Sequence, residues 1–385
     1  MEGLHFEGRM VPRISFGCGN IQKLGTEVKM LNGSTVLLVA DAALSGLGLT
    51  EKVRNIIESS GLQVIVFDQT EPEPTLETAD ACTRAGRDGH CDVVVGIGGG
   101  STMDTAKAAG VLLTNEGPAS DYQGQNLVKR PGVPTIMIPT TAGTGSEVTG
   151  VAVFINRQKQ LKLGINTPYV IPALALLDPE LTVTLPPSIT VSTGMDALTH
   201  AVESYISKSA TPLSEMFSLK AVECIGKNLK KAVENGRDLG ARSHMLFGSC
   251  LAGLAILNGG VCAAHAVSYP MSVFHKVPHG VGCGILLPRV VEQNRVHALE
   301  KIAKLWETVS DEKLSSPDQA ADRFIDFLYD ITLSTGLDES LKKFNITGPE
   351  IENLAEKTMA LTGVIANNPA PFTREDARKL LEKVC

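Results

Sequence analysis

The fold is decided by residues 93–107, which read VVVGIGGGSTMDTAK. The run Val93–Ile97 is short, apolar and β-branched, as is typical of a strand buried on both faces. Three glycines and Ser101 follow, and a helical stretch then continues through Lys107. Glycines after a strand let the backbone turn sharply and approach a ligand, and the following helix N-terminus offers unpaired N–H groups to an anion. The stretch therefore predicts a strand–turn–helix unit suited to a pyrophosphate.

A second polar loop follows another predicted strand, Thr135–Ile138. Residues 139–147 read PTTAGTGSE, with four hydroxyls interleaved with two glycines. Hydroxyls are costly to bury unpaired and suit phosphate or ribose oxygens. A single glycine turn could exist without a ligand, but open α/β sheets bind ligands beyond the carboxyl ends of their strands, where both loops lie. The two loops together predict a nucleotide site.

Asp41 ends the earliest of the predicted buried strands, which begins at Thr35. A carboxylate there accepts hydrogen bonds from ribose hydroxyls and repels a 2′-phosphate, which would select NAD over NADP. A helix N-cap explains the same residue equally well.

Similar short apolar runs, separated by helical spacing, occupy the first half of the chain. Short apolar runs recur at Thr35–Val39, Val64–Phe67, Val93–Ile97, Thr135–Ile138, Val151–Ile155 and Ala173–Leu177. Helical spacing between the first four, as at Leu49–Ser59 and Leu76–Arg87, predicts a parallel sheet with crossover helices. Thr75 is a plausible cap for the second of these helices.

The hydrophobic pattern changes near Pro186. Beyond it, short β-branched runs give way to apolar residues at helical spacing. Helices are expected at Leu213–Asn228, Ala241–Leu257, Ala298–Val309 and Pro317–Thr335, and a capping-box-like start at Thr373 predicts a last helix to about Val384. We therefore predict an α/β domain over residues 1–185 and an all-helical domain over residues 186–385.

Composition and charge exclude several classes of protein. The 385-residue chain has a formal net charge of −7, whereas nucleic-acid binding and docking on anionic lipid need a basic face. The sequence contains no run of about 18 apolar residues, so no membrane-spanning helix is predicted. The stretch from Met1 to Arg13 lacks the apolar core of a signal peptide. Eight dispersed cysteines without a C-x-x-C pair indicate free thiols in a cytoplasmic protein.

A set of histidines and one aspartate suggests a metal site. Asp196 and His200 are four residues apart, so they share one helix face, and His265, His275 and His279 fall within a short apolar stretch. We expect the sequence around His279, Pro-His-Gly, to form a sharp turn that presents the imidazole. One carboxylate and three imidazoles suit a divalent transition metal. Ordinary buried histidines and a helix-surface pair are the alternative.

The ordered motifs identify the chain as similar to the iron-containing (group III) alcohol dehydrogenase family over nearly its full length. The stretches that carry the resemblance are Pro12–Gly17, an opening strand; Gly98–Ser101 with Asp104 and Lys107; Pro139–Glu147; Asp178–Leu181; Thr193–Glu203; His265; and Pro278–Gly280. Several motifs in order are far more specific than any one of them.

The resemblance implies both a fold and a site. The fold is an N-terminal Rossmann-like domain and a C-terminal helical domain with the active site between them. The implied metal ligands are Asp196, His200, His265 and His279. The NAD contacts, completed from the two loops, are Asp41, Gly98, Gly99, Gly100, Ser101, Thr140, Thr141, Thr144, Ser146 and Lys162. The family name favours Fe²⁺, although Zn²⁺ should bind such ligands at least as tightly.

The chain also departs from the family pattern. Some members carry a histidine four residues after the third ligand, where this chain has Tyr269. His275 is therefore our candidate for the proton relay, and so for the catalytic residue; simple packing beside the metal is the alternative. Val151, Ile256 and Tyr269 are expected to line an apolar substrate pocket.

The predicted reaction is metal-assisted hydride transfer between NAD(H) and a short-chain primary alcohol or aldehyde, in a homo-oligomer of two or more chains. Two alternatives within this architecture are a hydroxyacid–oxoacid transhydrogenase and a lyase of the dehydroquinate-synthase type. The lyase would need a basic cluster for a polyanionic substrate, and none adjoins the predicted ligands. A non-catalytic nucleotide-binding subunit is a third alternative, against which the complete ligand set argues.

Overall fold

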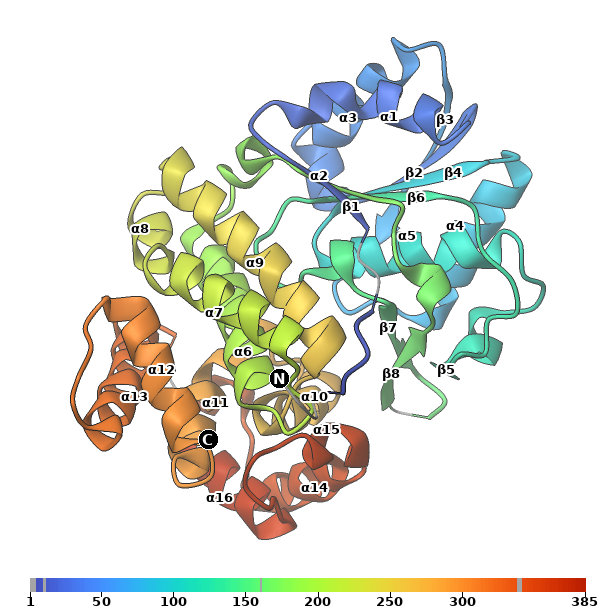
Figure 1. The fold of residues 1–385 in the computed structure, drawn as a ribbon. Coiled ribbons are helices and arrows are strands. Elements are labelled where there is room, and N and C mark those ends of the chain that lie inside the picture. Colours follow the sequence, from blue (N-terminus) through green and yellow to red (C-terminus); the bar gives the residue numbers. More distant parts are fainter. Residues whose placement is uncertain (1–4, 10–11, 160, 338–340) are drawn as a thin grey trace. The chain divides into compact units, whose positions relative to one another are not determined.

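The computed structural model describes residues 5–9, 12–159, 161–337 and 341–385 (Figure 1). The chain divides into two compact units: unit 1 comprises Met1–Met10, Ala142–Thr144 and Thr184–Cys385, and unit 2 comprises Val11–Thr141 and Gly145–Val183. The main passage from unit 2 to unit 1 lies close to residue 185. The predicted absence of a signal peptide concerns residues 1–13, of which 1–4, 10 and 11 lie outside the described residues.

Unit 2 is built on a six-stranded sheet in which every pairing is parallel. In spatial order its strands are β1 (Arg13–Phe16), β9 (Leu174–Leu177), β6 (Thr135–Pro139), β4 (Val93–Gly98), β2 (Thr35–Asp41) and β3 (Gln63–Thr70). The central strands are buried throughout, as their apolar runs predicted. This confirms the predicted parallel α/β fold class.

Alternating side chains of these strands bury two different sets of helices, because successive residues of a strand point to opposite faces. On one face, Val36 and Leu38 pack with α1 (Leu24–Met30) and α3 (Leu49–Glu58). On the other face, Leu37 and Val39 pack with α4 (Leu76–Asp88) and α5 (Gly100–Leu112). Thr75 caps α4 by accepting a hydrogen bond from the N–H of Thr78, which confirms its predicted role.

The run Val151–Ile155 does not belong to this parallel sheet. It forms β7 (Val151–Asn156), which pairs antiparallel with β8 (Leu161–Asn166) in a separate sheet completed by β5 (Gly124–Gln125). Burial alternates along β7, with Ala152 and Phe154 fully buried. Its apolar run was therefore misread as a strand buried on both faces, when it is a half-buried strand. The short β5 and the more polar β8 gave no strand signal.

Unit 1 is helical, as predicted. Its helices are α6 (Pro187–Ile206), α7 (Pro212–Gly226), α8 (Leu229–Glu234), α9 (Leu239–Gly259), α10 (Ala263–His275), α11 (His279–Asn294), α12 (Leu299–Ser310), α13 (Pro317–Ser334), α14 (Gly348–Met359), α15 (Thr362–Ala366) and α16 (Arg374–Val384). Thr373 and Asp376 form the predicted capping box at the start of α16. The remaining short elements are α2 (Ala42–Gly46) in unit 2 and 3₁₀ turns at Asn20–Lys23, Ala119–Tyr122, Ser146–Val148, Pro168–Val170, Pro179–Thr182 and Leu341–Phe344.

Helix α6 lies at the centre of unit 1 and packs against α7, α9 and α11 (Figure 1). It is buried almost continuously from Thr190 to Ile206. Helix α9 is long and apolar enough to cross a membrane by length and composition alone, a weak indication that core helices also meet. Since 67% of its apolar window is buried inside the structure, we describe it as a core helix of unit 1.

Candidate metal centre and nucleotide loops

Two carboxylates and one imidazole lie along the buried helix α6. Asp196, His200 and Glu203 are 3%, 6% and 0% exposed, and their spacing of four and three residues puts them on one face. Buried ionisable groups are costly unless they are paired or bind a metal. The face of α6 that carries them is therefore a candidate metal-binding or catalytic site of unit 1.

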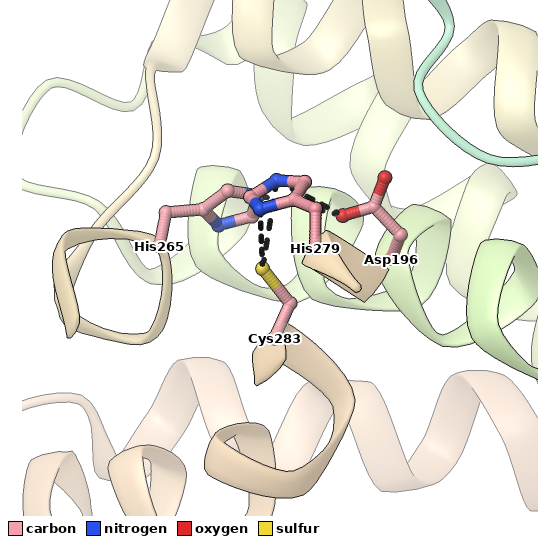
Figure 2. A group of neighbouring side chains, drawn as sticks. All are labelled: Asp196, His265, His279 and Cys283. Atoms are coloured by element: carbon pink, nitrogen blue, oxygen red, sulfur yellow. Dashed lines mark hydrogen bonds and ion pairs between the residues drawn. The ribbon is translucent and has the colours of Figure 1, made fainter. Parts of the chain in front are cut away.

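Four potential metal donors converge at this face: Asp196, His265, His279 and Cys283, with ligand atoms all within 4.8 Å of one another. Figure 2 shows both imidazoles turned toward the carboxylate and the sulfur. Oδ1 of Asp196 lies 3.8 Å from Nε2 of His265 and 3.6 Å from Nε2 of His279. Three of the four predicted ligands thus meet although they come from three different helices.

His200, the fourth predicted ligand, lies beside this group. Its ring stacks on that of His265, with centroids 4.6 Å apart and an interplanar angle of 16°. Burial lowers the pKa of His200 to about 4, so its ring is neutral and able to donate a lone pair. The structure therefore places His200 in contact with the donors but not among the four convergent atoms.

Glu203 holds His265 in place. Its carboxylate is fully buried and accepts hydrogen bonds from Nδ1 of His265 at 2.6 Å, the N–H of Ala264 at 2.6 Å and the N–H of Cys262 at 2.8 Å. With the Nδ1 proton donated to Glu203, Nε2 faces the donor group. Such a carboxylate partner is a usual companion of a metal-binding histidine.

The sequence reasoning assigned Glu203 no role beyond the family motif. The available signal was its spacing of seven residues from Asp196, which returns it to the same helix face. Burial lowers the pKa of His265, but Cys283 and Glu203 raise it more, and the net shift is well upward.

His279 is the first residue of α11, with Pro278 as its N-cap. The sharp turn expected at Pro-His-Gly is therefore a helix start. The next residue, Gly280, explains the closeness of α11 to α6: a Cβ there would lie 2.1 Å from the carbonyl oxygen of Ser192. Because no side chain intervenes, the two helices approach closely enough for His279 to reach Asp196.

Cys283 lies one turn after His279 on α11 and is fully buried. Its Sγ is 3.7 Å from Nε2 of His279. Burial raises the pKa of the Cys283 thiol. The sequence reasoning treated all eight cysteines alike, although the four-residue spacing from His279 was the signal that this one shares its helix face.

The remaining predicted residues of unit 1 surround this centre in part. The ring of Tyr269 stacks on His279 with centroids 5.3 Å apart, and Ile256 is half-buried on α9. His275 is the last residue of α10, and its Nδ1 lies 4.0 Å from Oε1 of Glu350 on α14. His275 therefore has a carboxylate partner of its own. Val151, the other predicted pocket residue, begins β7 in unit 2.

In unit 2, the two predicted loops follow neighbouring strands. Gly98 at the end of β4 pairs with Pro139 at the end of β6. The backbone of Gly98 has φ +156°, and a Cβ there would lie 2.7 Å from Thr102. Gly99 is the N-cap of the thirteen-residue helix α5 and provides no side chain to pair with its first N–H groups, which begin at Gly100. This is the strand–turn–helix unit that the sequence predicted, with unpaired N–H groups at the start of α5.

Most of the polar side chains predicted to contact NAD are bonded within the protein. Oδ1 of Asp41 accepts a hydrogen bond from the N–H of Leu44 at 2.9 Å and caps α2, so the N-cap interpretation is correct. Its other oxygen accepts a long hydrogen bond from Thr102 at 3.4 Å. Thr140 is buried, and its N–H donates to the carbonyl of Gly98. Thr141 is partly exposed, and Thr144 belongs to the segment counted with unit 1.

Ser146 belongs to a hydrogen-bond network that links the start of α5 to the loop before β7. Its hydroxyl donates to Oδ1 of Asp104 at 2.5 Å and accepts from the fully buried Lys107 at 2.7 Å. Lys107 also donates to the hydroxyl of Thr149 at 3.1 Å, and Asp104 accepts from the N–H of Val153. Burial lowers the pKa of Lys107, and Asp104 opposes that shift. The Asp and Lys of the sequence motif therefore hold residues 146–153 in place.

Lys162 and Ser101 meet through a residue that the sequence analysis did not single out. Nζ of Lys162 lies 2.5 Å from a carboxylate oxygen of Glu73, and the N–H of Glu73 donates to the hydroxyl of Ser101 at 3.3 Å. Glu73 has a left-handed backbone with φ 56°. Two predicted NAD contacts are thus brought together by a third, strained residue.

Family models match both parts of the chain. The model described as iron-containing alcohol dehydrogenase matches residues 12–179, and the model for the C-terminal part of the Fe-containing alcohol dehydrogenase family matches residues 190–385.

Individual proteins are similar over almost the whole chain. Long-chain-alcohol dehydrogenase 1 of Geobacillus thermodenitrificans is 36% identical, covering 96% of this chain and 94% of its own. An NAD-dependent methanol dehydrogenase of Bacillus methanolicus is 35% identical, covering 96% and 97%. A crystal structure of 1,3-propanediol oxidoreductase superposes with a TM-score of 0.95 at 32% identity, covering 99% of this chain and 100% of that one.

Proposed function

The chain belongs to the iron-containing alcohol dehydrogenase family, and on this premise we propose that it transfers hydride reversibly between NAD(H) and a short-chain primary alcohol or aldehyde with the help of a bound divalent metal. The observation that carries the proposal is the convergence of the buried Asp196 and His265 with the partly exposed His279. A relative that is named an NAD-dependent methanol dehydrogenase supports the choice of cofactor.

The residues fit a metal ion. Metal–nitrogen and metal–oxygen bonds of about 2.0–2.2 Å in a tetrahedral site imply ligand atoms about 3.3–3.6 Å apart. The carboxylate oxygen lies 3.8 Å and 3.6 Å from the two imidazole nitrogens, so a small closing of the donors would bring them to these separations. We propose that Asp196, His265 and His279 hold the ion, with His200 as the further imidazole that the family resemblance implies. Fe²⁺ and Zn²⁺ both suit carboxylate and imidazole donors.

When bound, the metal supplies a Lewis acid for the substrate oxygen, and NAD(H) supplies or accepts the hydride. The protein's own residues orient and tune these groups. Glu203 keeps the proton of His265 on Nδ1, so the Nε2 lone pair faces the ion. Asp196 contributes the one negative charge of this ligand set, which leaves a divalent ion with a net charge of +1 and an affinity for an anionic oxygen.

Unit 2 would hold the cofactor mainly through its backbone. The N–H groups at the start of α5 suit the pyrophosphate, and Gly98 and Gly99 leave room for it. Asp41 and the Lys162–Glu73–Ser101 chain are the candidates for contact with its polar groups. We propose that residues 1–185 form the NAD-binding domain and residues 186–385 the metal-binding domain.

We keep His275 as the candidate for proton release. Its Nδ1 lies 4.0 Å from Oε1 of Glu350, and imidazole is a common proton carrier near neutral pH. If His275 carries the substrate proton to water, His275→Asn should lower turnover and shift its pH profile. An unchanged profile would remove the role.

The substrate class rests on the apolar lining predicted in unit 1. Tyr269 stacks against His279, and Ile256 is half-buried. Val151 stays a prediction.

Free thiols at all eight cysteines support a cytoplasmic location. A homo-oligomer is our expectation, to be checked by light scattering.

The test is aldehyde-dependent NADH oxidation. The protein would be purified without oxygen, loaded with Fe²⁺ or Zn²⁺, and offered short aldehydes that are plain, hydroxylated or anionic. Turnover that requires the metal and stops when a chelator removes it would establish the dehydrogenase.

Other outcomes would favour the alternatives. Hydride exchange between two substrates without free NADH would indicate the transhydrogenase. Metal and NAD binding without net oxidation of NADH on any aldehyde would indicate the lyase.

A further inference from the structure

We propose that Glu73 limits the affinity for NAD(H) by pairing with Lys162, so that the ammonium does not act on the cofactor's phosphates as a full positive charge. This inference rests on the proposed function and assigns a specific role to a residue beside the candidate nucleotide loops. Glu73 is a positioning residue in this account, because it sets the place and the charge of Lys162 and takes no part in hydride transfer.

Glu73 lies against the first turn of α5, where the pyrophosphate would bind. Its N–H donates to the hydroxyl of Ser101 at 3.3 Å, and Ser101 is the second residue of that helix. The first N–H groups of a helix have no acceptor one turn earlier, which makes them suitable for an anion. The carboxylate of Glu73 is therefore no farther from these N–H groups than the length of a few side chains.

The charge of Glu73 is paired with that of Lys162. Oε2 of Glu73 lies 2.5 Å from Nζ of Lys162, and the two side chains are 30% and 11% exposed. Charges that are partly removed from water are screened less by salt than charges on an open surface. The pair carries no net charge, whereas Lys162 without Glu73 would add a positive charge beside the start of α5.

The small sheet of unit 2 brings the two residues together. The carbonyl of Pro74 accepts a hydrogen bond from the N–H of Ile155 at 2.9 Å, so the residue after Glu73 is fixed to β7. Ile155 in turn lies directly opposite Lys162 in the pairing of β7 with β8. Lys162 is thus placed beside the loop that follows β3, and the contact with Glu73 does not depend on a chance side-chain conformation.

The backbone of Glu73 is poorly suited to its position. Its φ of 56° is in the left-handed region, which glycine, asparagine and aspartate tolerate better than glutamate. Residues held in such conformations cluster at ligand sites, where the surrounding structure imposes them. Glycine or asparagine would relieve the backbone but would remove the carboxylate that faces Lys162. The side chain of Glu73, not its backbone, therefore suits the site.

The pair has a consequence for the cofactor. The pyrophosphate of NAD(H) is negatively charged, so a full positive charge at Lys162 would tighten binding, and the carboxylate of Glu73 opposes that gain. The oxidised or reduced cofactor must leave after each turnover, and product release limits the rate of many enzymes. Pairing with Glu73 keeps Lys162 at the site without the full electrostatic attraction. The simpler alternative is that the pair only fastens β8 to the loop after β3.

Fluorescence titration with NADH tests the proposal on the full-length, metal-loaded protein. Glu73→Gln keeps the size of the side chain and an acceptor for Lys162 but removes the charge. NADH should then bind about 3- to 10-fold more tightly, and its affinity should fall more steeply with added salt. Glu73→Asp keeps the charge and should stay close to wild type. Glu71→Gln removes the same charge from an exposed residue of the same loop and should leave the affinity within about 2-fold.

A second comparison decides the question if Glu73→Gln alone fails to fold. Lys162→Met leaves the carboxylate of Glu73 unpaired, so NADH should bind more weakly than to the wild type. Adding Glu73→Gln to Lys162→Met should recover part of that loss, because it removes the repulsion. A pair that only fastens the loop predicts no recovery, since the contact is already lost in Lys162→Met.

The outcomes separate this inference from the proposed function. If wild-type protein binds NADH but Glu73→Gln binds it equally or more weakly, the role of Glu73 is overturned and the proposed function stands. The absence of recovery in the double variant would likewise overturn the role of Glu73. A metal-loaded wild-type protein that does not bind NADH would overturn both.

Discussion

The candidate metal centre of unit 1 and the candidate nucleotide loops of unit 2 are built in opposite ways. In unit 1, side-chain atoms of Asp196, His265, His279 and Cys283 converge to within 4.8 Å of one another. In unit 2, the polar side chains of the predicted site are largely bonded to neighbours, as Ser146 is to Lys107 and Asp41 is to the start of α2. The first site offers side-chain donor atoms to a ligand. The second offers backbone N–H groups, and its buried side chains hold that backbone in place.

The largest effect should follow from removing a donor in unit 1. Asp196→Asn keeps the shape but removes the charge that attracts the ion, so we expect metal content at background and turnover lower by about 10³-fold or more, since the metal supplies several kcal/mol of stabilisation. Elemental analysis and NADH oxidation measure both. Asp238→Asn, which replaces the cap of α9 by another good cap, is the control. Full metal content in Asp196→Asn would mean that the Asp196 carboxylate is not needed to hold the ion.

The corresponding change in unit 2 should act on stability. Lys107→Met leaves the partly exposed Asp104 and the hydroxyl of Ser146 without the ammonium, and breaking a fully buried pair costs about 3–5 kcal/mol, an upper bound here. Denaturant unfolding measures the loss. Lys52→Met on the exposed side of α3 should change the free energy of unfolding by less than about 0.5 kcal/mol. If both variants unfold alike, Lys107 does not hold the loop.

Glu203 differs from the proposed ligands because it bonds to His265 and is not itself one of the converging donors. Glu203→Gln should lower metal affinity by about 10–100-fold, the usual loss when a carboxylate behind a ligand histidine is removed. Competition with a chelator measures this affinity. Glu234→Gln on the surface of α8 should leave it unchanged. An affinity equal to wild type would mean that His265 is positioned by packing alone.

The smallest effect should come from Asp41. Asparagine caps a helix about as well as aspartate, so Asp41→Asn should keep stability but raise activity with NADPH relative to NADH. Asp41→Ala should also lose about 1 kcal/mol of stability with its cap. If neither variant changes the cofactor preference, Asp41 is only a cap.

The same contrast explains what could be predicted from the sequence. Apolar runs such as Val93–Ile97 predicted the parallel strands because burial on both faces leaves a continuous hydrophobic pattern. The spacing of Asp196 and His200 predicted a shared helix face. Strand β7 was misassigned because its partly buried positions are also apolar, which hides the alternation that marks a half-buried strand.

The missed residues of the site depend on contacts between helices distant in sequence. Glu203 meets His265 across 62 positions, and no local pattern reports such a meeting. The approach of α11 to α6 depends on the missing side chain of Gly280 against Ser192, which a single sequence does not reveal. Cys283 joins the donors only because of that approach.

The central claim is that a metal held by the buried donors of unit 1 is required for hydride transfer. Metal content per chain should be measured together with aldehyde-dependent NADH oxidation, before and after a chelator and again after metal is restored. We predict one ion per chain, loss of activity in step with loss of the ion, and recovery on reloading. Full activity in the metal-free protein would contradict the account.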